Sequence, residues 1–238
     1  LDLFQGETLA LVGESGSGKS VTAHSILRLL PFSASHPNGE IIFEGENLLQ
    51  LADSKIRSIR GNRIGMIFQE PMSSLNPLHT IEKQIKEVLF IHQGLGHKKA
   101  QERTIELLKM VEIQNPEKRL GAFPHELSGG QRQRVMIAMA LANHPDILIA
   151  DEPTTALDVT VQAQVLKLLD QIQEQFKMAI ILITHDLGLV RKHANRVAVM
   201  TQGKIIETSN TESIFLKPKH PYTKKLLDSE PSGIPVPT

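Results

Sequence analysis

One eight-residue segment constrains the fold of this 238-residue chain more than any other. Gly13–Ser20 reads GESGSGKS and matches the pattern G-x-x-x-x-G-K-[ST], directly after the apolar run Thr8–Val12. Glycines let successive backbone N–H groups converge on an anion, and a helix that starts at the loop adds its positive end. The pattern therefore predicts a strand, a phosphate-binding loop and a helix over Lys19–Leu30. The alternative is a Gly/Ser-rich turn that binds nothing.

Within this loop, the side-chain chemistry assigns two specific roles. Lys19 would place a positive charge on the β- and γ-phosphates of a nucleotide, and the Ser20 hydroxyl would ligate Mg²⁺. The loop residues expected to contact the nucleotide are Gly13, Ser15, Gly16, Ser17, Gly18, Lys19 and Ser20. By itself the loop indicates only that a nucleotide binds.

Apolar strand-like runs alternate with helical patterns, which favours an α/β fold with a mainly parallel sheet and helices on its faces. A helix is also expected over Val159–Phe176, and a closing hairpin near Val197–Glu207 turns at Gln202–Gly203. The remaining predicted strands are Glu40–Phe43, Ile64–Phe68, Ile147–Asp151 and Ala179–Thr184.

From Ile81 to about Leu120 the apolar residues recur three and four apart, with charges between them. Gly94–Gly96 and Asn115–Pro116 interrupt this helical pattern. A further helical stretch, Arg132–Ala142, follows. The pattern predicts a helical lobe over about residues 81–142, inserted into the α/β core.

Two carboxylates, Asp151 and Glu152, end the apolar strand Ile147–Asp151. We expect this strand beside the phosphate-loop strand, where Asp151 reaches Mg²⁺ through water. Glu152 would then orient and deprotonate the attacking water, a contribution of roughly 10²–10⁴-fold in rate. The alternative is that the pair caps a helix or lies in a solvated turn.

Gln69 and His185 also follow predicted strands. His185 could donate a hydrogen bond to the γ-phosphate, and the Gln69 amide oxygen suits Mg²⁺ or the attacking water. A lone histidine after a strand is otherwise a surface or core residue.

Leu127–Gln131 reads LSGGQ and precedes a helical stretch. Ser128, Gly129, Gly130 and Gln131 would form a second anion site at a helix N-terminus. If two domains pack head to tail, this site in one domain can close over the γ-phosphate held by the other.

Taken together, these motifs resemble the nucleotide-binding domain of ABC transporters. In the family's order, the matched positions are Gly13–Ser20 (Walker A), Gln69 (Q-loop), Leu127–Gln131 (signature), Asp151 and Glu152 (Walker B and its catalytic Glu), Ala156–Asp158 (D-loop) and His185 (switch His). The resemblance implies a P-loop NTPase core of the RecA-like type, with an antiparallel β subdomain and the inserted helical lobe. It also implies ATP and Mg²⁺ as cofactors, with Glu152, His185 and Gln69 catalytic and with Ser20, Gln69 and Asp151 near the metal. Asp158 would contact the opposite subunit, and capping a helix at Val159 is compatible with that role.

Three further segments look like the dipeptide and oligopeptide importer group: Gln69–Pro77, Phe123–Glu126 and His220–Thr223. That resemblance implies an ATPase that energises peptide uptake through integral-membrane permease subunits, with an extracytoplasmic peptide-binding protein as an indirect partner. It places the domain at the cytoplasmic face of a bacterial inner membrane. It is also similar to the first half of a fused two-domain ATPase of the microcin C and peptide uptake type, in which a sister domain replaces a second copy. Cysteine is absent, so no iron–sulfur site is expected.

The first residues suggest a chain that begins in mid-strand. The resemblance also implies an adenine-stacking aromatic well upstream of the phosphate loop, and only twelve residues precede Gly13. We therefore expect the first strand and this platform to be missing, with Phe4 unassigned and residues 229–238 acting as a linker.

Two other functions compete with transport. A soluble ABC ATPase acting on DNA or ribosomes is disfavoured because Lys+Arg and Asp+Glu are equal at 26 each, which predicts no nucleic-acid partner. A non-catalytic regulatory half would have a damaged motif, and Lys19, Gln69, Ser128, Glu152 and His185 are all present.

Overall fold

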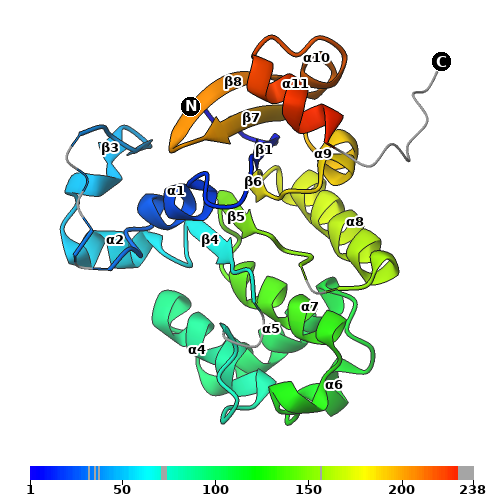
Figure 1. The fold of residues 1–238 in the computed structure, drawn as a ribbon. Coiled ribbons are helices and arrows are strands. Elements are labelled where there is room, and N and C mark those ends of the chain that lie inside the picture. The colour runs from blue at the N-terminus through cyan, green and yellow to red at the C-terminus, as the bar shows by residue number, and fades with distance from the viewer. Residues whose placement is uncertain (32, 35, 37, 71–73, 156, 230–238) are drawn as a thin grey trace.

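The computed structural model describes all residues except 32, 35, 37, 71–73, 156 and 230–238. In this described part, a six-stranded sheet has the order β4-β5-β6-β1-β7-β8 (Figure 1). All neighbours pair in parallel except β8, which runs antiparallel to β7. The mainly parallel α/β architecture is thus confirmed. The strands are β1 (Thr8–Val12), β4 (Ile64–Ile67), β5 (Ile147–Asp151), β6 (Ala179–Ile183), β7 (Arg196–Thr201) and β8 (Lys204–Asn210).

The predicted pairing of Ile147–Asp151 with the phosphate-loop strand is wrong. Strand β6 lies between β5 and β1 and pairs with both. All five residues of β6 are apolar and buried, which suits a central strand covered on both faces. Helix α1 (Lys19–Ile26) nevertheless contacts β5, so the loop and the acidic strand end remain close.

Helix α1 ends at Ile26 rather than at Leu30, because Arg28 takes a left-handed conformation (φ 50°) that closes the helix. The predicted strand Glu40–Phe43 is shorter in the structure. Only Ile42–Phe43 forms a strand, β2, and it pairs antiparallel with β3 (Glu46–Asn47). The other helical elements are η1 (Leu48–Gln50), α2 (Asp53–Ile59), α4 (Ile81–Gln93), α5 (His97–Met110), α6 (Pro116–Arg119), η2 (Pro124–Glu126), α7 (Gly129–Ala140), α8 (Val159–Phe176), α9 (Leu187–His193), α10 (Thr211–Leu216) and α11 (Pro221–Asp228).

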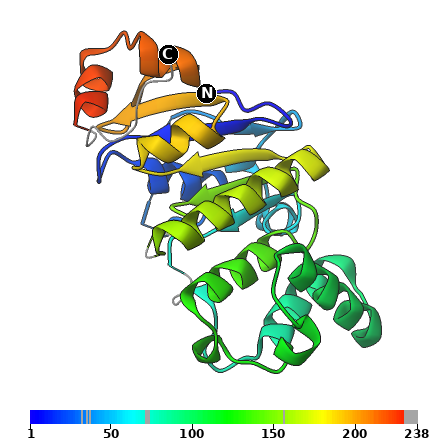
Figure 2. The same ribbon diagram turned by 90° about the vertical axis from the view of Figure 1, so that its right-hand side faces the viewer.

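Helices α4 to α7 occupy the region predicted as a helical lobe and gather at one end of the molecule (Figure 2). The breaks fall where the sequence places them: Gly94 (φ 59°) closes α4, and Asn115 (φ 50°) precedes Pro116 at the start of α6. In the part of the chain that the structure describes, no helix has both the length and the apolar character that a bilayer crossing needs.

Both faces of the sheet are covered by apolar clusters. Helices α1 and α2 pack on one face, where Leu9 and Leu11 of β1 point. Ala10 and Val12 point to the opposite face, which α9 and α10 cover. Helices α5, α7 and α8 join that same face over β5 and β6, through residues such as Leu148. Because β1, β4, β5 and β6 are parallel, their carboxyl ends meet at one edge of the sheet, and the predicted site residues follow these ends.

Candidate functional site

The loop after β1 has the tight backbone that its glycines predict. A Cβ on Gly13 would lie 2.1 Å from the backbone oxygen of Met200 on β7, so no larger residue fits there. Gly18 (φ 106°) is the left-handed residue at which α1 begins. Ser15 and Gly16, at the tip of the loop, are exposed.

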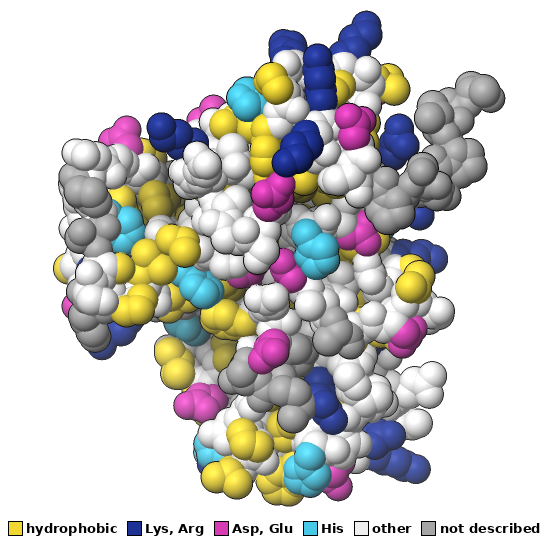
Figure 3. All heavy atoms as spheres, in the orientation of Figure 1, with side chains coloured by type: hydrophobic (Ala, Val, Ile, Leu, Met, Phe, Trp, Pro, Cys, Tyr) yellow, Lys and Arg dark blue, Asp and Glu magenta, His cyan; other side chains and the backbone are white. Residues whose placement is uncertain are grey.

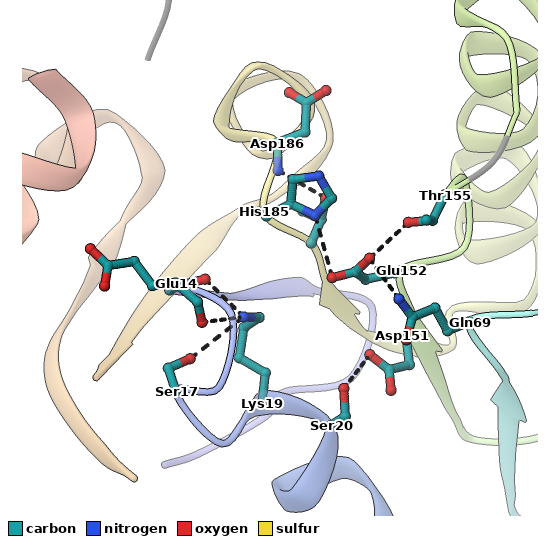
Figure 4. A network of polar contacts seen from close by, with 12 residues as sticks. Glu14, Ser17, Lys19, Ser20, Gln69, Asp151, Glu152, Thr155, His185 and Asp186 are labelled. Atoms are coloured by element: carbon teal, nitrogen blue, oxygen red, sulfur yellow. Dashed lines mark hydrogen bonds and ion pairs between the residues drawn. The ribbon is translucent and has the colours of Figure 1, made fainter. Parts of the chain in front are cut away.

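Lys19 lies inside the curve of this loop and is 6% exposed. Its Nζ donates to the Gly13 carbonyl at 2.8 Å and to the Glu14 carbonyl at 3.0 Å (Figure 4). Burial lowers the pKa of Lys19, while the charges of Glu152 and Asp151 act in the opposite direction. The ammonium group therefore lies at the point on which the loop converges, facing two carboxylates.

Ser20 and Asp151 bring oxygen atoms together beside the loop. The Ser20 hydroxyl donates to Asp151 Oδ1 at 3.1 Å, and Asp151 is buried. Burial raises the pKa of Asp151, and the Ser20 hydrogen bond opposes that effect. A hydroxyl and one carboxylate suit Mg²⁺, which usually binds one or two carboxylates together with substrate phosphates and water. No group of three or more His, Cys, Asp or Glu side chains that could hold a metal ion is found among the described residues.

Glu152 is the centre of a second group of polar contacts, shown in Figure 4. Gln69 Nε2 donates to its Oε2 at 3.1 Å, and His185 Nδ1 lies 3.3 Å from its Oε1. Glu152 has a left-handed backbone (φ 47°), a strained conformation for a residue with a side chain. Its N–H donates to the Ile183 carbonyl of β6 at 2.9 Å. The strand ends therefore bring together three side chains that lie far apart in sequence.

Thr155 is a member of this group that the sequence analysis missed. Its hydroxyl donates to Glu152 Oε2 at 2.8 Å, on the same oxygen that Gln69 contacts. A threonine four residues after a strand end carries no sequence signal of its own. Its contact arises from the turn that follows β5, where the Thr155 N–H also bonds the Glu152 carbonyl.

The signature residues lie apart from this group. Ser128 Oγ accepts the Gln131 N–H at 3.3 Å, and Gln131 Oε1 accepts the Ser128 N–H at 3.0 Å, a reciprocal cap on α7. Ser128 and Gly129 are exposed. A Cβ on Gly130 would lie 2.7 Å from Val161 Cγ1, so a glycine lets α7 approach α8. In the described residues, neither Ser128 nor Gln131 forms a hydrogen bond to the Lys19 loop or to Glu152.

Asp158 caps α8, with Oδ1 accepting the Val161 N–H at 3.0 Å. The helix-capping interpretation is therefore confirmed, and contact with an opposite subunit stays a prediction. Ala156 and residues 71–73 of the predicted Q-loop segment lie outside the described residues. Phe4 is mostly exposed, and its ring faces the Arg196 guanidinium at 5.1 Å.

Comparison with known proteins identifies the family. A model of the ABC transporter family matches residues 1–155. The chain belongs to the ABC transporter family. It is 64% identical to the Peptidoglycan transport ATP-binding protein YejF of Agrobacterium fabrum, over 98% of this chain and 43% of that protein. It is 55% identical to the Oligopeptide transport ATP-binding protein OppD of Bacillus subtilis, over 97% of this chain and 64% of that protein. The ABC chain thus spans less than two thirds of either relative.

Solved structures show the same fold. The dimeric structure of a post-hydrolysis state of the ATP-binding cassette MJ0796, bound to ADP and Pi, has a TM-score of 0.77 at 32% identity and covers 89% of this ABC chain and 88% of that one. The structure of cbiO1 from Clostridium perfringens, part of the ABC transporter complex cbiONQ, has a TM-score of 0.76 at 28% identity and covers 91% and 82%.

Proposed function

We propose that this ABC chain is the ATP-hydrolysing domain of an importer that energises uptake of peptides or peptide-like compounds. The observation that carries the proposal is the convergence of Gln69, Glu152 and His185 beside the Lys19 loop, at one edge of the sheet. A phosphate cradle next to a carboxylate held by two polar side chains is what hydrolysis of a bound triphosphate requires.

In this proposal the loop amides and Lys19 bind the β- and γ-phosphates, which fixes the γ-phosphorus relative to the strand ends. Glu152 accepts a proton from the attacking water at its carboxylate. Gln69 and His185 contact that carboxylate. In the proposal Gln69 orients the attacking water, and His185 donates a hydrogen bond to a γ-phosphate oxygen. Thr155 holds the carboxylate in place.

Ser20 and Asp151 would hold Mg²⁺, together with the amide oxygen of Gln69, whose Nε2 is engaged by Glu152. When bound, the metal would neutralise charge on the β- and γ-phosphate oxygens. The residues present fit it because they offer oxygen ligands beside the phosphate cradle.

The site is completed by a second ABC domain in a head-to-tail dimer. Ser128, Gly129 and the N-terminus of α7 would bind the γ-phosphate held by the partner, and Asp158 would lie at that junction. Support comes from the exposure of Ser128 and Gly129 and from the dimeric state of MJ0796. The partner would be a fused sister domain or another copy of this chain; the chain covers 43% of YejF from Agrobacterium fabrum, which is compatible with a sister domain in one polypeptide.

The substrate class follows from the relatives, which are named for peptidoglycan, oligopeptide and dipeptide transport. The remaining partners would be integral-membrane permease subunits, docked near Gln69–Leu78 at the cytoplasmic face of the membrane. An extracytoplasmic peptide-binding protein would deliver the substrate to them.

The chemical step is tested with Glu152→Gln. We expect this variant to bind ATP but to release phosphate at least ~10²-fold more slowly, because it loses the general base. Lys19→Ala should instead lose nucleotide binding, since it removes ground-state charge pairing. Glu174→Gln, an exposed site on α8, is the matched control and should behave as wild type. Near-normal turnover of Glu152→Gln would assign the base to another residue.

The transport role is tested in cells that produce the protein. Uptake of a labelled tripeptide should be abolished by Glu152→Gln, and integral-membrane subunits should copurify from detergent-solubilised membranes. Copurification with ribosomes or DNA, with normal peptide uptake, would instead favour a soluble ABC ATPase.

A further inference from the structure

The C-terminal helix α11 contacts the phosphate loop directly. The backbone N–H of Glu14 donates to the hydroxyl of Tyr222 at 3.2 Å, although the two residues are 208 positions apart. Glu14 is the second residue of the loop, and its carbonyl accepts from Lys19 Nζ at 3.0 Å. One backbone residue therefore joins α11 to the side chain that faces the nucleotide phosphates in the proposed function.

Further supports of the loop come from the hairpin β7–β8. The Gly203 N–H of its turn donates to the Ser17 carbonyl at 2.9 Å, and the Met200 oxygen lies against Gly13. Inside the loop, the Ser17 N–H donates to the Glu14 carbonyl at 3.1 Å. The hairpin thus contacts Gly13 and Ser17, whereas among the described residues only Tyr222 bonds the N–H of Glu14 between them.

Helix α11 is itself anchored to the hairpin. Glu207 of β8 accepts the N–H groups of Lys219 and His220, each at 2.9 Å, and His220 Nδ1 accepts the Tyr222 N–H at 3.1 Å. Burial raises the pKa of Glu207, but hydrogen bonding to its carboxylate outweighs burial, so the pKa lies below its ordinary value. The ring of Tyr222 packs on the apolar cluster that contains Val12 and Val199. The hydroxyl is therefore presented from a fixed position.

We propose that Tyr222 is a positioning residue for the nucleotide site. Tyr222 acts through Glu14, because its hydroxyl holds the Glu14 N–H. This contact fixes the position of the Glu14 carbonyl, which in turn orients the Lys19 ammonium group. This inference rests on the proposed function, because it concerns how tightly the same loop binds a nucleotide. Through Tyr222, helix α11 would have a role in the ATP site in addition to packing on the rest of the fold.

The test removes only the hydroxyl. In the full chain, Tyr222→Phe keeps the ring and its packing. The matched control is Lys225→Ala, at an exposed position of α11. Figure 3 shows Lys and Arg side chains gathered over the C-terminal elements to which α11 belongs. Two readouts are needed: affinity for Mg·ADP by calorimetry, and hydrogen exchange of individual amides by NMR.

For Tyr222→Phe we expect Mg·ADP to bind about three- to tenfold more weakly, which corresponds to the net free energy of one hydrogen bond. We also expect the Glu14 amide hydrogen to exchange faster than in wild type. The amides of Lys219 and His220, which Glu207 holds, should keep their wild-type protection. Lys225→Ala should match wild type in both readouts.

Wild-type affinity together with an unchanged Glu14 amide would overturn the inference. So would loss of protection throughout α11, because it would make Tyr222 a packing residue for that helix. The failure of the proposed function is a separate result: wild type would then bind no nucleotide, and Lys19→Ala would make no difference, whatever the Glu14 amide does.

Discussion

Glu152 combines a strained backbone with a side chain that three other residues hold. Its φ of 47° costs of the order of 1–3 kcal/mol, a cost that surrounding contacts must offset. The contacts come from Gln69, Thr155 and His185, each from a different segment of the chain. Figure 4 shows the Glu152 carboxylate beside His185, which follows β6, and the Asp151 carboxylate beside Ser20. Two adjacent acidic residues thereby acquire different surroundings.

Thr155 offers a test of this arrangement. Thr155→Val removes the hydroxyl that bonds Glu152 Oε2 and keeps the shape of the side chain. We expect kcat for ATP hydrolysis to fall about three- to tenfold, with KM little changed, because the carboxylate loses one of its hydrogen bonds and ATP binding does not use it. Steady-state phosphate release measures both constants. Thr155→Ser keeps the hydroxyl and should restore kcat; an equal loss in both variants would argue against positioning by the hydroxyl.

At the scale of elements, polar side chains cap the helices that present the site. Ser128 caps α7, Asp158 caps α8 and Asp186 caps α9, each by accepting an N–H of the first turn. Such caps leave the other N–H groups of the first turn available to an anion. The motif residues Ser128 and Asp158 thus stabilise their own helices, whatever they contact across a dimer.

Asp158 allows the two roles to be separated. Asp158→Ala removes the cap and should lower the free energy of unfolding by about 1 kcal/mol, whereas Asp158→Asn should keep most of it. Urea unfolding of the full chain measures the difference. If Asp158 also acts at a dimer interface, Asp158→Asn should reduce ATPase activity in the assembled protein despite its stability. Equal stability of the Ala variant and wild type would show that the cap contributes nothing.

The packing of α5 and α8 against the end of α7 predicts a pH effect. His144 Nε2 accepts from Arg103 of α5 at 2.8 Å, and its ring lies 4.9 Å from that of Phe176. Burial, and then the charge of Arg103, lower the pKa of His144 in the fold. Because the pKa of His144 is lower in the folded state than in the unfolded state, the neutral imidazole contributes to the free energy of unfolding. This contribution is fully present above the ordinary histidine pKa of about 6.5 and is lost as the pH falls through the lowered value.

We therefore expect the Tm of the full chain to be lower at about pH 5 than at about pH 7. In His144→Phe we expect this decrease in Tm to be smaller than in wild type. Thermal unfolding at the two pH values measures it. The control is His125→Phe, at an exposed position, which should leave the pH dependence unchanged. An identical fall in His144→Phe and wild type would contradict the assignment.

Considered as a whole, the molecule places the two proposed anion-binding surfaces on different parts of the chain. The Lys19 loop follows a central strand of the sheet, while Ser128 begins a helix of the segment that gathers at one end in Figure 2. In the described residues no hydrogen bond connects them. A composite site between two domains would bring the two surfaces together.

Mixing two inactive variants tests this composite site. Lys19→Ala and Ser128→Arg should each abolish ATPase activity, the second by placing a bulky cation where a γ-phosphate must fit. A mixed dimer contains one site built from an intact loop and an intact α7 N-terminus, so mixing should restore activity, up to about a quarter of the wild-type rate when each site acts alone and the chains pair at random. Phosphate release in titrated mixtures measures it. No restoration, with dimers formed, would place the whole site within one chain.

The sequence alone determined the groups that can do chemistry and the type of fold. The loop Gly13–Ser20, the acidic end of β5 and the cap at Ser128 depend on neighbours a few residues away, so their spacing predicts their local conformation. Apolar runs predicted β1, β5 and β6, because a strand covered on both faces needs continuous apolar character. The breaks at Gly94 and Asn115 follow from the backbone preferences of single residues.

Only the tertiary structure decided which distant segments meet. Strand β6 lies between β1 and β5 and pairs with both, and a linear pattern of apolar residues contains no strand order. The contact of Tyr222 with Glu14 and the limit that Met200 sets at Gly13 depend on where α11 and β7 pack. Such contacts arise from the packing of elements far apart in sequence, which is why local spacing predicts the loop and not what holds it.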